Sequence, residues 1–270
     1  MNNPAFKENV VIITGASSGI GYQLALQLAD HGAWLSLAAR NAEKLNETAE
    51  QCRQRGGRAL AVPTDVAQKS ECQNLIERTV AEYGRIDTLI NNAGISMVKR
   101  FDEIQNLDYF ERIIQVNYLG SVYCTFYALP YLKKTGGRIV GISSLSGKVG
   151  SPTTSGYAAS KHAMAGFFDS LRIELAGEGV SVTMIFPSFV ATKGRKAKRG
   201  ALSGIMEVEV CAQMIIQAAA QRRRELIMTT LGKASVWVKL IAPGLVDSLS
   251  QQAMAGVRKR QGTIDERDAP

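Results

Sequence analysis

A regular alternation of short apolar or β-branched runs with longer amphipathic stretches constrains the fold of this chain more than any other feature. The runs predict strands at residues 9–14, 34–39, 58–63, 87–92, 137–143, 181–187 and 225–229. Apolar residues at helical spacing predict helices at residues 20–32, 41–57, 69–84, 107–134 and 155–176. Such alternation implies a parallel sheet covered on both faces, because right-handed crossovers place the helices over it. The sequence therefore predicts a doubly wound α/β fold of about seven strands in three α/β/α layers.

The whole chain, residues 1–270, is predicted to form one domain, since no shift in composition marks a linker and no internal repeat is visible. With 46% hydrophobic and 21% charged residues, a chain of this length can bury a large core. No apolar run approaches the roughly 20 residues that span a bilayer. The N-terminus lacks the basic and long apolar segments of a secretory signal. These features favour a cytoplasmic protein.

Charge and cysteine content narrow the function only slightly. The net charge of +8 suits a nucleic acid, a membrane surface or an anionic ligand, but no nucleic-acid-binding motif accompanies it. The four well-separated cysteines are Cys52, Cys72, Cys124 and Cys211. They form no CxxC pair, and the two histidines add no metal-ligand spacing. We therefore expect reduced packing cysteines, no metal site and no nucleic-acid partner.

A glycine-rich turn with the sequence TGASSGIG follows the first predicted strand, at residues 14–21. Its glycines stand at 15, 19 and 21, which is a GxxxGxG spacing rather than GxGxxG. Backbone N–H groups and the dipole of the following helix can hold a pyrophosphate at such a turn. Its place between a hydrophobic strand and a long amphipathic helix predicts dinucleotide binding on a Rossmann-type fold.

The second predicted strand ends in Ala39 and Arg40. An acidic residue there would accept hydrogen bonds from the adenosine ribose of NAD, which Ala39 cannot do. The Arg40 guanidinium can instead bind a 2′-phosphate. The alternative is a solvated arginine that binds no ligand. The pattern favours NADP over NAD as the cofactor.

Tyr157 and Lys161 stand four residues apart in a segment with helical periodicity, so both side chains leave the same helix face. A phenol, with a pKa of about 10, is a poor acid or base at neutral pH, but a neighbouring ammonium favours the phenolate. Ser144 could hydrogen-bond the same reacting oxygen. This trio suits proton transfer at a carbonyl or alcohol oxygen and needs a cofactor for the hydride. The alternative is a buried tyrosine beside a solvated lysine.

Together these features resemble the short-chain dehydrogenase/reductase family over roughly residues 9–230. The matching positions, in the family's order, are residues 14–21, Asp65 and Val66, the NNAG of 91–94, Asn117, Ser144, Tyr157 and Lys161, and the stretch after Pro187. The resemblance implies a cofactor that lies across the carboxyl ends of the strands. It also implies an enzyme acting on CH–OH groups.

The resemblance further implies which residues bind the cofactor. The pyrophosphate turn would be formed by Gly15, Ser17, Ser18, Gly19, Ile20 and Gly21. Asp65 and Val66 would contact the adenine. The ribose between adenine and nicotinamide would lie against Asn91, Ala93 and Gly94. The nicotinamide carboxamide would be bracketed by Pro187, Val190 and Thr192.

Four residues would carry the chemistry by the same resemblance. Tyr157 would be the acid/base, and Lys161 would also bind the nicotinamide ribose. Ser144 would polarise the substrate carbonyl, with Ser143 as its rival. Asn117 would hold a water that links Lys161 to solvent. Turn or helix-kink roles are the alternatives for the two asparagines, at positions 91 and 117.

One departure from the family concerns the residue after Pro187, which is usually glycine and here is Ser188. If that glycine takes a positive φ, Ser188 would be strained or the turn altered. The departure weakens the expected roles of Val190 and Thr192 more than those of the four catalytic candidates.

The substrate loop is expected at about residues 188–206, and it contains five cations at Lys193, Arg195, Lys196, Lys198 and Arg199. These could bind an anionic substrate, attract acidic lipid headgroups, or simply be solvated. The remaining pocket side chains would come from loops 94–101 and 145–151. These loops are mostly small or apolar, which suits a hydrophobic substrate.

An apolar and basic extension at about residues 232–260 is interrupted by Pro243 and Gly244. It could cap the substrate pocket, pack in a homo-oligomer, or lie on a bilayer surface as a peripheral contact. It faintly resembles the tails of acyl- or alkyl-dihydroxyacetone-phosphate reductases and ketosphinganine reductases. Homodimers or homotetramers are expected from the family.

These observations predict an NADPH-dependent reductase that converts a ketone into an alcohol, with lipid-like ketones among the candidate substrates. An NAD-dependent alcohol dehydrogenase of the same fold is the first alternative, and it would favour an acidic residue near Ala39. A cofactor-binding protein without catalysis, acting as a membrane or regulatory partner, is the second. Such proteins usually lose part of the catalytic set, and this chain keeps all of it.

Overall fold

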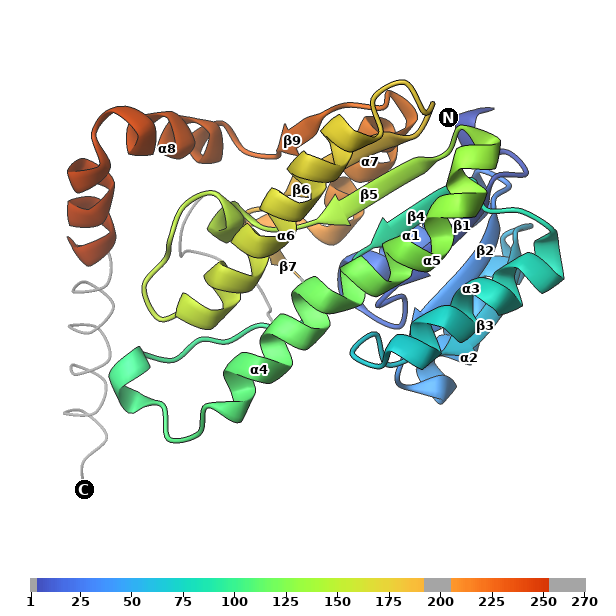
Figure 1. Ribbon diagram of the computed structural model, residues 1–270, viewed down its shortest axis with the longest axis horizontal. Coiled ribbons are helices and arrows are strands. Elements are labelled where there is room, and N and C mark those ends of the chain that lie inside the picture. The colour runs from blue at the N-terminus through green and yellow to red at the C-terminus, as the bar shows by residue number, and fades with distance from the viewer. Residues whose placement is uncertain (1–3, 192–204, 253–270) are drawn as a thin grey trace.

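One parallel sheet of seven strands forms the centre of the protein (Figure 1). The computed structural model describes residues 4–191 and 205–252. The strands are β1 (Val10–Thr14), β2 (Trp34–Ala39), β3 (Arg58–Pro63), β4 (Thr88–Asn91), β5 (Arg138–Ile142), β6 (Ser181–Phe186) and β9 (Glu225–Ile227). They lie in the order β3-β2-β1-β4-β5-β6-β9, with every neighbouring pair parallel. The predicted α/β fold is confirmed.

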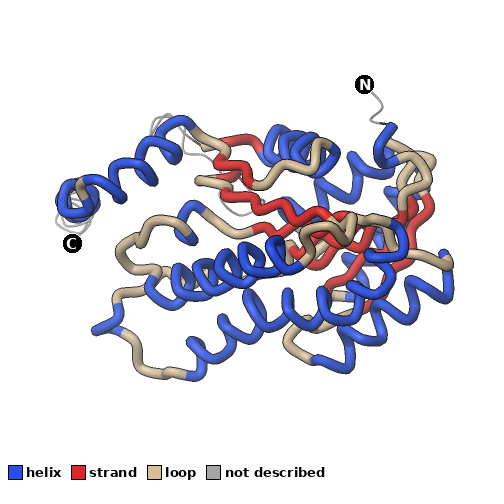
Figure 2. The backbone as a smooth tube through the Cα atoms, turned by 45° about the horizontal axis from the view of Figure 1, so that its top comes forward, coloured by secondary structure: helices blue, strands red, loops and turns tan. Residues whose placement is uncertain are grey.

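Helices cover both faces of the sheet, as Figure 2 shows. One face packs against α1 (Gly19–Asp30), α2 (Ala42–Gln54) and α7 (Val208–Ala220). The other packs against α3 (Lys69–Tyr83), α5 (Gly120–Thr135) and α6 (Ser155–Glu174). Successive residues of a strand point to opposite faces, so Val11 and Ile13 join the first core and Ile12 joins the second. Of these helices, α7 was not predicted from the sequence.

The segment predicted as one helix at residues 107–134 is helical, but its hydrogen-bond pattern changes from α to π and back to α. It consists of α4 (Asp108–Ile114), a π-helical turn (Gln115–Leu119) and α5. A π-helical turn widens the helix locally and often marks a functional site. Here it contains Asn117, whose side chain is fully buried.

The chain between β6 and the C-terminus departs most from the prediction. A separate short sheet pairs β7 (Val190–Ala191) with β8 (Met206–Glu207), which had not been predicted. After β9 come α8 (Thr230–Ile241) and a further helical stretch at residues 243–252. The cations of the expected substrate loop and the last part of the expected extension lie outside the described residues. The assignment of residues 1–270 to one domain stays a prediction.

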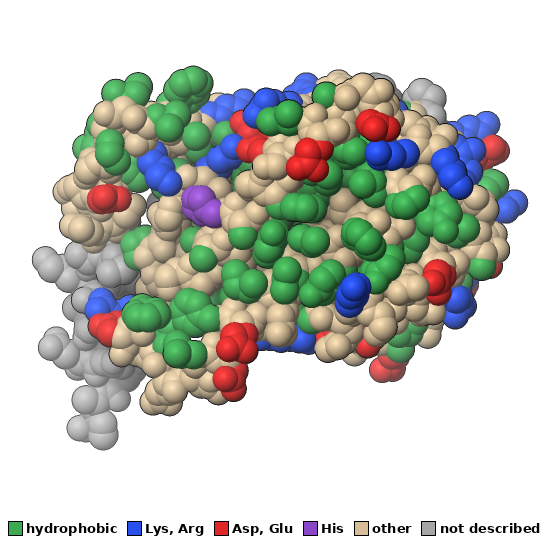
Figure 3. All heavy atoms as spheres, viewed as in Figure 1, with side chains coloured by type: hydrophobic (Ala, Val, Ile, Leu, Met, Phe, Trp, Pro, Cys, Tyr) green, Lys and Arg blue, Asp and Glu red, His purple; other side chains and the backbone are tan. Residues whose placement is uncertain are grey.

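Short 3-10 turns complete the structure at Pro4–Phe6, Phe101–Glu103 and Leu145–Gly147. Among the residues that the structure describes, no helix is both long and apolar enough to cross a membrane. Figure 3 shows apolar side chains on the surface at the end where α8 lies and across the face that carries α5 and α6.

The expected strain at Ser188 is absent. The non-glycine residues with positive φ in the described chain are Glu8, Thr153 and Arg222. The turn after β6 is instead held through Pro187, whose carbonyl accepts a hydrogen bond of 2.8 Å from the Leu145 N–H. A serine is therefore accommodated after Pro187 without the conformation that favours glycine.

Two glycine-to-alanine substitutions test the packing of the first turn. A Cβ at Gly21 would lie 2.2 Å from the Gly15 carbonyl oxygen, whereas Gly150 has open space around it. We expect Gly21→Ala to lower the free energy of unfolding by about 2 kcal/mol or more, because backbone must move. Gly150→Ala should raise it by about 0.5 kcal/mol, by restricting the unfolded chain. Urea denaturation measures both, and equal effects of the two substitutions would contradict the packing described.

Candidate active site

The carboxyl ends of β1 and β4 are tied together by short hydrogen bonds. The Thr14 hydroxyl accepts from the N–H groups of Asn92 and Ala93, each at 3.0 Å. The Asn92 amide donates to the Thr14 carbonyl at 2.8 Å. Gly15, with φ of +69°, approaches Ala93 so closely that a Cβ would lie 2.9 Å from the Ala93 Cα. The strand order changes direction between β1 and β4, and ligands of such folds bind at this point.

A cleft of about 610 Å³ opens over these strand ends. Of the predicted cofactor residues, it is lined by Gly15, Ser17, Ser18, Ile20, Arg40, Asp65, Val66, Ala93 and Gly94. The cleft has further lining residues that the sequence does not single out as cofactor contacts, namely Ala39, Asn41, Thr64, Asn92, Ile95 and Val116. A cleft of this size, beside the N-terminus of α1, fits an extended dinucleotide.

Glycine at position 94 keeps this cleft open toward the catalytic candidates. A Cβ there would lie 3.3 Å from the Asn117 Oδ1 and 3.5 Å from the Lys161 Nζ. A larger side chain would fill the space between the cleft and these two polar groups. Gly94 therefore leaves room for a cofactor to reach them.

Charge at the mouth of the cleft favours an anion. Arg40 is exposed there, while Asp65 is the one carboxylate among the lining residues. Asp65 forms an ion pair with Arg112, with 2.6 Å between the nitrogen and the oxygen. Partial burial by itself would raise the pKa of Asp65. This effect is outweighed by the hydrogen bond from Arg112, the hydrogen bond from the Ala67 N–H, and the positive charges of Arg112 and Arg40. The pKa of Asp65 is therefore below its usual value. Arg112 was not found from the sequence, because it lies 47 residues from its partner.

Several predicted cofactor residues lie beside the cleft rather than on its wall. Gly19 begins α1, and Gly21 is buried under the turn. Asn91 is 2% exposed, and its amide donates to the Thr125 hydroxyl at 3.1 Å, so its side chain faces the core. The neighbouring Asn92 lines the cleft instead.

The residues expected at the nicotinamide end are placed only in part. Pro187 follows β6 and is buried. Val190 lies in β7 and is half-buried. Thr192 lies outside the described residues, so its predicted contact stays a prediction.

Lys161 is a buried cation at the centre of the catalytic candidates. Its side chain is 3% exposed, and Nζ donates to the Ile142 carbonyl at the end of β5 over 2.8 Å. The same Nζ lies 5.9 Å from the centre of the Tyr157 ring. The helical spacing in α6 thus brings this pair together as predicted from the sequence.

The two adjacent serines have different environments. Ser143 is buried, and its hydroxyl donates to the Lys161 carbonyl at 3.1 Å. Ser144 is half-buried, and its hydroxyl oxygen accepts from the Ser146 N–H at 3.1 Å. A hydroxyl in that position still has its proton to donate to another group. The geometry favours Ser144 over Ser143 as the residue that meets a substrate.

Asn117 links the π-helical turn to the loop after β4. Its Oδ1 accepts from the Ile95 N–H at 2.8 Å, and its Nδ2 donates to the Ile95 carbonyl at 3.0 Å. The same Nδ2 donates to the Ser160 hydroxyl at 2.9 Å, one residue before Lys161. These bonds fix the loop that contains Gly94. The water-holding role of Asn117 stays a prediction.

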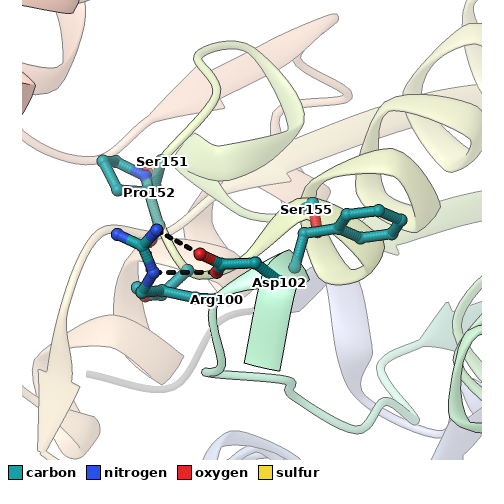
Figure 4. A pocket seen from close by; sticks show the side chains of 7 residues that line it. Arg100, Asp102, Ser151, Pro152 and Ser155 are labelled. Carbon is teal, nitrogen blue, oxygen red and sulfur yellow. Dashed lines mark hydrogen bonds and ion pairs between the residues drawn. The ribbon is translucent and has the colours of Figure 1, made fainter. Parts of the chain in front are cut away.

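A second hollow, of about 410 Å³, lies next to the start of α6 (Figure 4). Arg100 and Asp102 pair on one side of it, and Ser151 and Pro152 lie on the other. The two loops are joined by a hydrogen bond of 2.7 Å from the Lys99 N–H to the Thr153 carbonyl. The sequence predicts a substrate pocket from loops 94–101 and 145–151, which contain three of the lining residues, Arg100, Phe101 and Ser151. The other lining residues, Asp102, Pro152, Thr153 and Ser155, lie just beyond those bounds.

The chain belongs to the short-chain dehydrogenase family, whose model matches residues 9–202. The family assignment made from the sequence is confirmed. The protein is accordingly an NAD(P)-dependent oxidoreductase that acts on CH–OH groups.

Similar proteins occur among plant dehydrogenases. An 11-beta-hydroxysteroid dehydrogenase-like protein 4A of Arabidopsis thaliana is 36% identical, covering 88% of this chain and 82% of its own. The 11-beta-hydroxysteroid dehydrogenase 1A of the same plant is 34% identical, over 90% and 75% of the two chains. The 11-beta-hydroxysteroid dehydrogenase A of Sesamum indicum is 35% identical, over 88% and 73%.

Burial of Lys161 leads to a prediction about stability and pH. Desolvation lowers its pKa from 10.5 to about 8 in the folded protein. Below pH 8 the lysine is protonated in both the folded and unfolded states, and its burial cost is constant. Between pH 8 and 10.5 only the unfolded state keeps the proton, so the folded protein gains stability as pH rises.

We therefore expect wild type to gain roughly 3 kcal/mol relative to Lys161→Met between pH 7 and pH 10.5. Urea denaturation of both proteins at several pH values measures this change, and titration of other groups cancels in the difference. A difference between the two proteins that does not vary with pH would contradict the lowered pKa.

Proposed function

We propose that the protein is an NADPH-dependent reductase that converts a hydrophobic ketone into a secondary alcohol. The observation that carries the proposal is the meeting of Tyr157 and buried Lys161 at the carboxyl ends of the strands, directly beside the cleft. The cofactor would supply the hydride that these side chains cannot provide.

Each catalytic candidate has a defined task in this proposal. The Tyr157 hydroxyl gives its proton to the carbonyl oxygen of the substrate and takes it back in the reverse direction. The Lys161 ammonium stabilises the phenolate that Tyr157 leaves behind, and it acts strongly because it is buried. The Ser144 hydroxyl donates to the same substrate oxygen. Asn117 keeps the Ile95 loop and Ser160 in place beside Lys161.

Preference for NADPH rests on Arg40. Its guanidinium lies at the mouth of the cleft, and the neighbouring Ala39 offers no carboxylate to a ribose hydroxyl. Asp65 is already engaged by Arg112. A 2′-phosphate would therefore meet the Arg40 cation, and the one carboxylate among the lining residues is already paired with Arg112. The NAD-dependent alternative would need an acceptor for the ribose hydroxyls at this position.

Two observations support the proposed substrate class, the names of the relatives and the second hollow. Three similar proteins have hydroxysteroid dehydrogenase names. Phe101, which lines the hollow, exposes 66% of its surface. Both facts support a bulky apolar ketone, of steroid-like or lipid-like size, over a small polar one.

Substituting Arg40 tests the cofactor preference. We expect Arg40→Ala to weaken NADPH binding by about tenfold to a hundredfold, the usual value of a charge-assisted hydrogen bond. NADH binding should change less than about twofold. Titration of NAD(P)H fluorescence measures both affinities. Arg55→Ala removes an equal charge at the far end of α2, from an exposed pair with Asp30, and should change neither. Equal or tighter binding of NADH by wild type would refute the NADPH preference.

Substituting Tyr157 tests the reaction. With NADPH and a panel of steroid and long-chain ketones, we expect Tyr157→Phe to lower turnover by about a hundredfold to ten-thousandfold. Binding of NADPH should persist in this variant. Tyr22→Phe serves as a control, because that hydroxyl bonds Gln51 instead. Unchanged turnover by Tyr157→Phe on a confirmed substrate would exclude the proposed acid/base.

A further inference from the structure

An arm formed by α8 and the helical stretch 243–252 exposes more large apolar side chains than any other described segment of its length. The large apolar side chains of the arm that are more than half exposed are Leu231 (79%), Trp237 (67%), Leu240 (72%), Ile241 (81%), Leu245 (53%) and Leu249 (56%). Figures 1 and 2 show the arm extending from the body at the end opposite β3. Figure 3 shows apolar atoms gathered there. Patches of this kind on a water-soluble surface mark interaction sites.

The exposed side of α8 is more apolar than that of an ordinary surface helix. The positions with least exposure are Gly232, Ser235, Val236, Val238 and Lys239. Among residues 231–241 the exposed positions are Leu231, Lys233, Ala234, Trp237, Leu240 and Ile241, and all of them except Lys233 are apolar. Leu231, Ala234, Trp237 and Ile241 form an outward apolar row. A helix that packed only against its own protein would turn its apolar row inward. The outward row therefore faces a surface other than this chain's core.

Polar contacts hold the helix in this orientation. The Thr229 hydroxyl caps its first turn by accepting from the Gly232 N–H at 3.1 Å. Lys239 Nζ donates to the Lys148 carbonyl at 2.8 Å. Lys148 in turn pairs with Glu225 of β9 at 2.9 Å. The arm is thus anchored to the loop that follows Ser144, and its apolar row is fixed outward.

Neighbouring segments extend the apolar surface. The loop before α4, which contains Val98 and Phe101, lies at the same end of the molecule as the arm (Figures 1 and 2). Phe101 lines the second hollow, and the arm bonds Lys148, in the loop that leads to the other side of that hollow. A surface that contacted this end would therefore contact the side on which we place the substrate.

We propose that the arm docks onto a membrane surface rich in anionic lipid, with Leu231, Trp237 and Ile241 at the boundary between headgroups and acyl chains. Tryptophan prefers this boundary because its ring is apolar and its N–H is polar. The arm itself has Lys233, Lys239 and Asp247 as its charged residues within the described chain. The whole chain has a net charge of +8.

Charge favours a membrane over a second copy of this chain as the partner of the arm. The net charge of +8 attracts the protein to an anionic bilayer, whereas it adds only repulsion to the approach of a second copy. With no described helix able to span a bilayer, the arm would lie in the interface. The proposal does not depend on the reaction proposed above.

Vesicle flotation tests the proposal. Full-length protein is mixed with vesicles of phosphatidylcholine alone or with about one third phosphatidylserine. We expect wild type to float with the anionic vesicles, with binding weakened by added salt. Trp237→Gln combined with Ile241→Gln should bind at least about tenfold more weakly. Phe126→Gln with Ile173→Gln, which removes side chains 68% and 75% exposed on α5 and α6, should bind like wild type.

Two further measurements decide between the possible outcomes. NADPH titration should give the same affinity for wild type and both double variants, which shows that they are folded independently of the membrane result. Light scattering should give the same mass for wild type and the arm variant. The proposal is overturned if wild type does not float with the anionic vesicles, or if the arm variant floats equally well. It is also overturned if the arm variant has a smaller mass than wild type, because a second copy would then cover the arm.

Discussion

The buried ammonium of Lys161 is the interaction on which the rest of the site depends. A cation that is 3% exposed is costly, and the carbonyl of Ile142 at the end of β5, which accepts its hydrogen bond at 2.8 Å, offsets only part of that cost. The remainder lowers the pKa of Lys161 to about 8. The Ser143 hydroxyl bonds the Lys161 carbonyl, which ties the loop after β5 to α6. Gly147 completes this junction, because a Cβ there would lie 2.4 Å from the Ser143 oxygen. Sheet, loop and helix are thus positioned around a single charge.

The cleft depends on a different constraint, the close approach of backbones at the ends of β1 and β4. Gly15 and Gly21 allow the first turn to pass under Ala93 and Asn92 without side chains between them. Thr14 and Asn92 then hold the two strand ends by hydrogen bonds. The space left above them is a cleft in which the described lining contains one carboxylate, already paired with Arg112. Packing in the turn therefore sets both the shape and the charge of the site.

The same loops connect the site with the surface of the molecule. The loop that begins at Ser144 ends at Lys148, which contacts both β9 and α8. The substrate side of a reductase for apolar ketones and an outward apolar arm would then share one end of the protein. An apolar substrate partitions into lipid, so a site near a membrane surface would meet it at higher concentration. The two proposals agree in this respect although each has its own test.

The sequence by itself determined the features that depend on local spacing. Alternating apolar runs specify the parallel sheet, the glycines of residues 14–21 specify the turn, and a separation of four residues puts Tyr157 and Lys161 on one helix face. These signals are short-range, so they are visible without the fold. They led to the correct fold and family.

Tertiary structure alone decided the features that depend on distant partners. Asn91 turns into the core toward Thr125 while Asn92 faces the cleft, which the motif by itself does not show. Asp65 meets Arg112 only because the loop after β3 and α4 come together. Likewise, which row of α8 faces outward is set by Lys239 reaching the Lys148 carbonyl, 91 residues away. Hydrogen bonds and ion pairs between distant segments fix the direction of a side chain, and no local pattern encodes them.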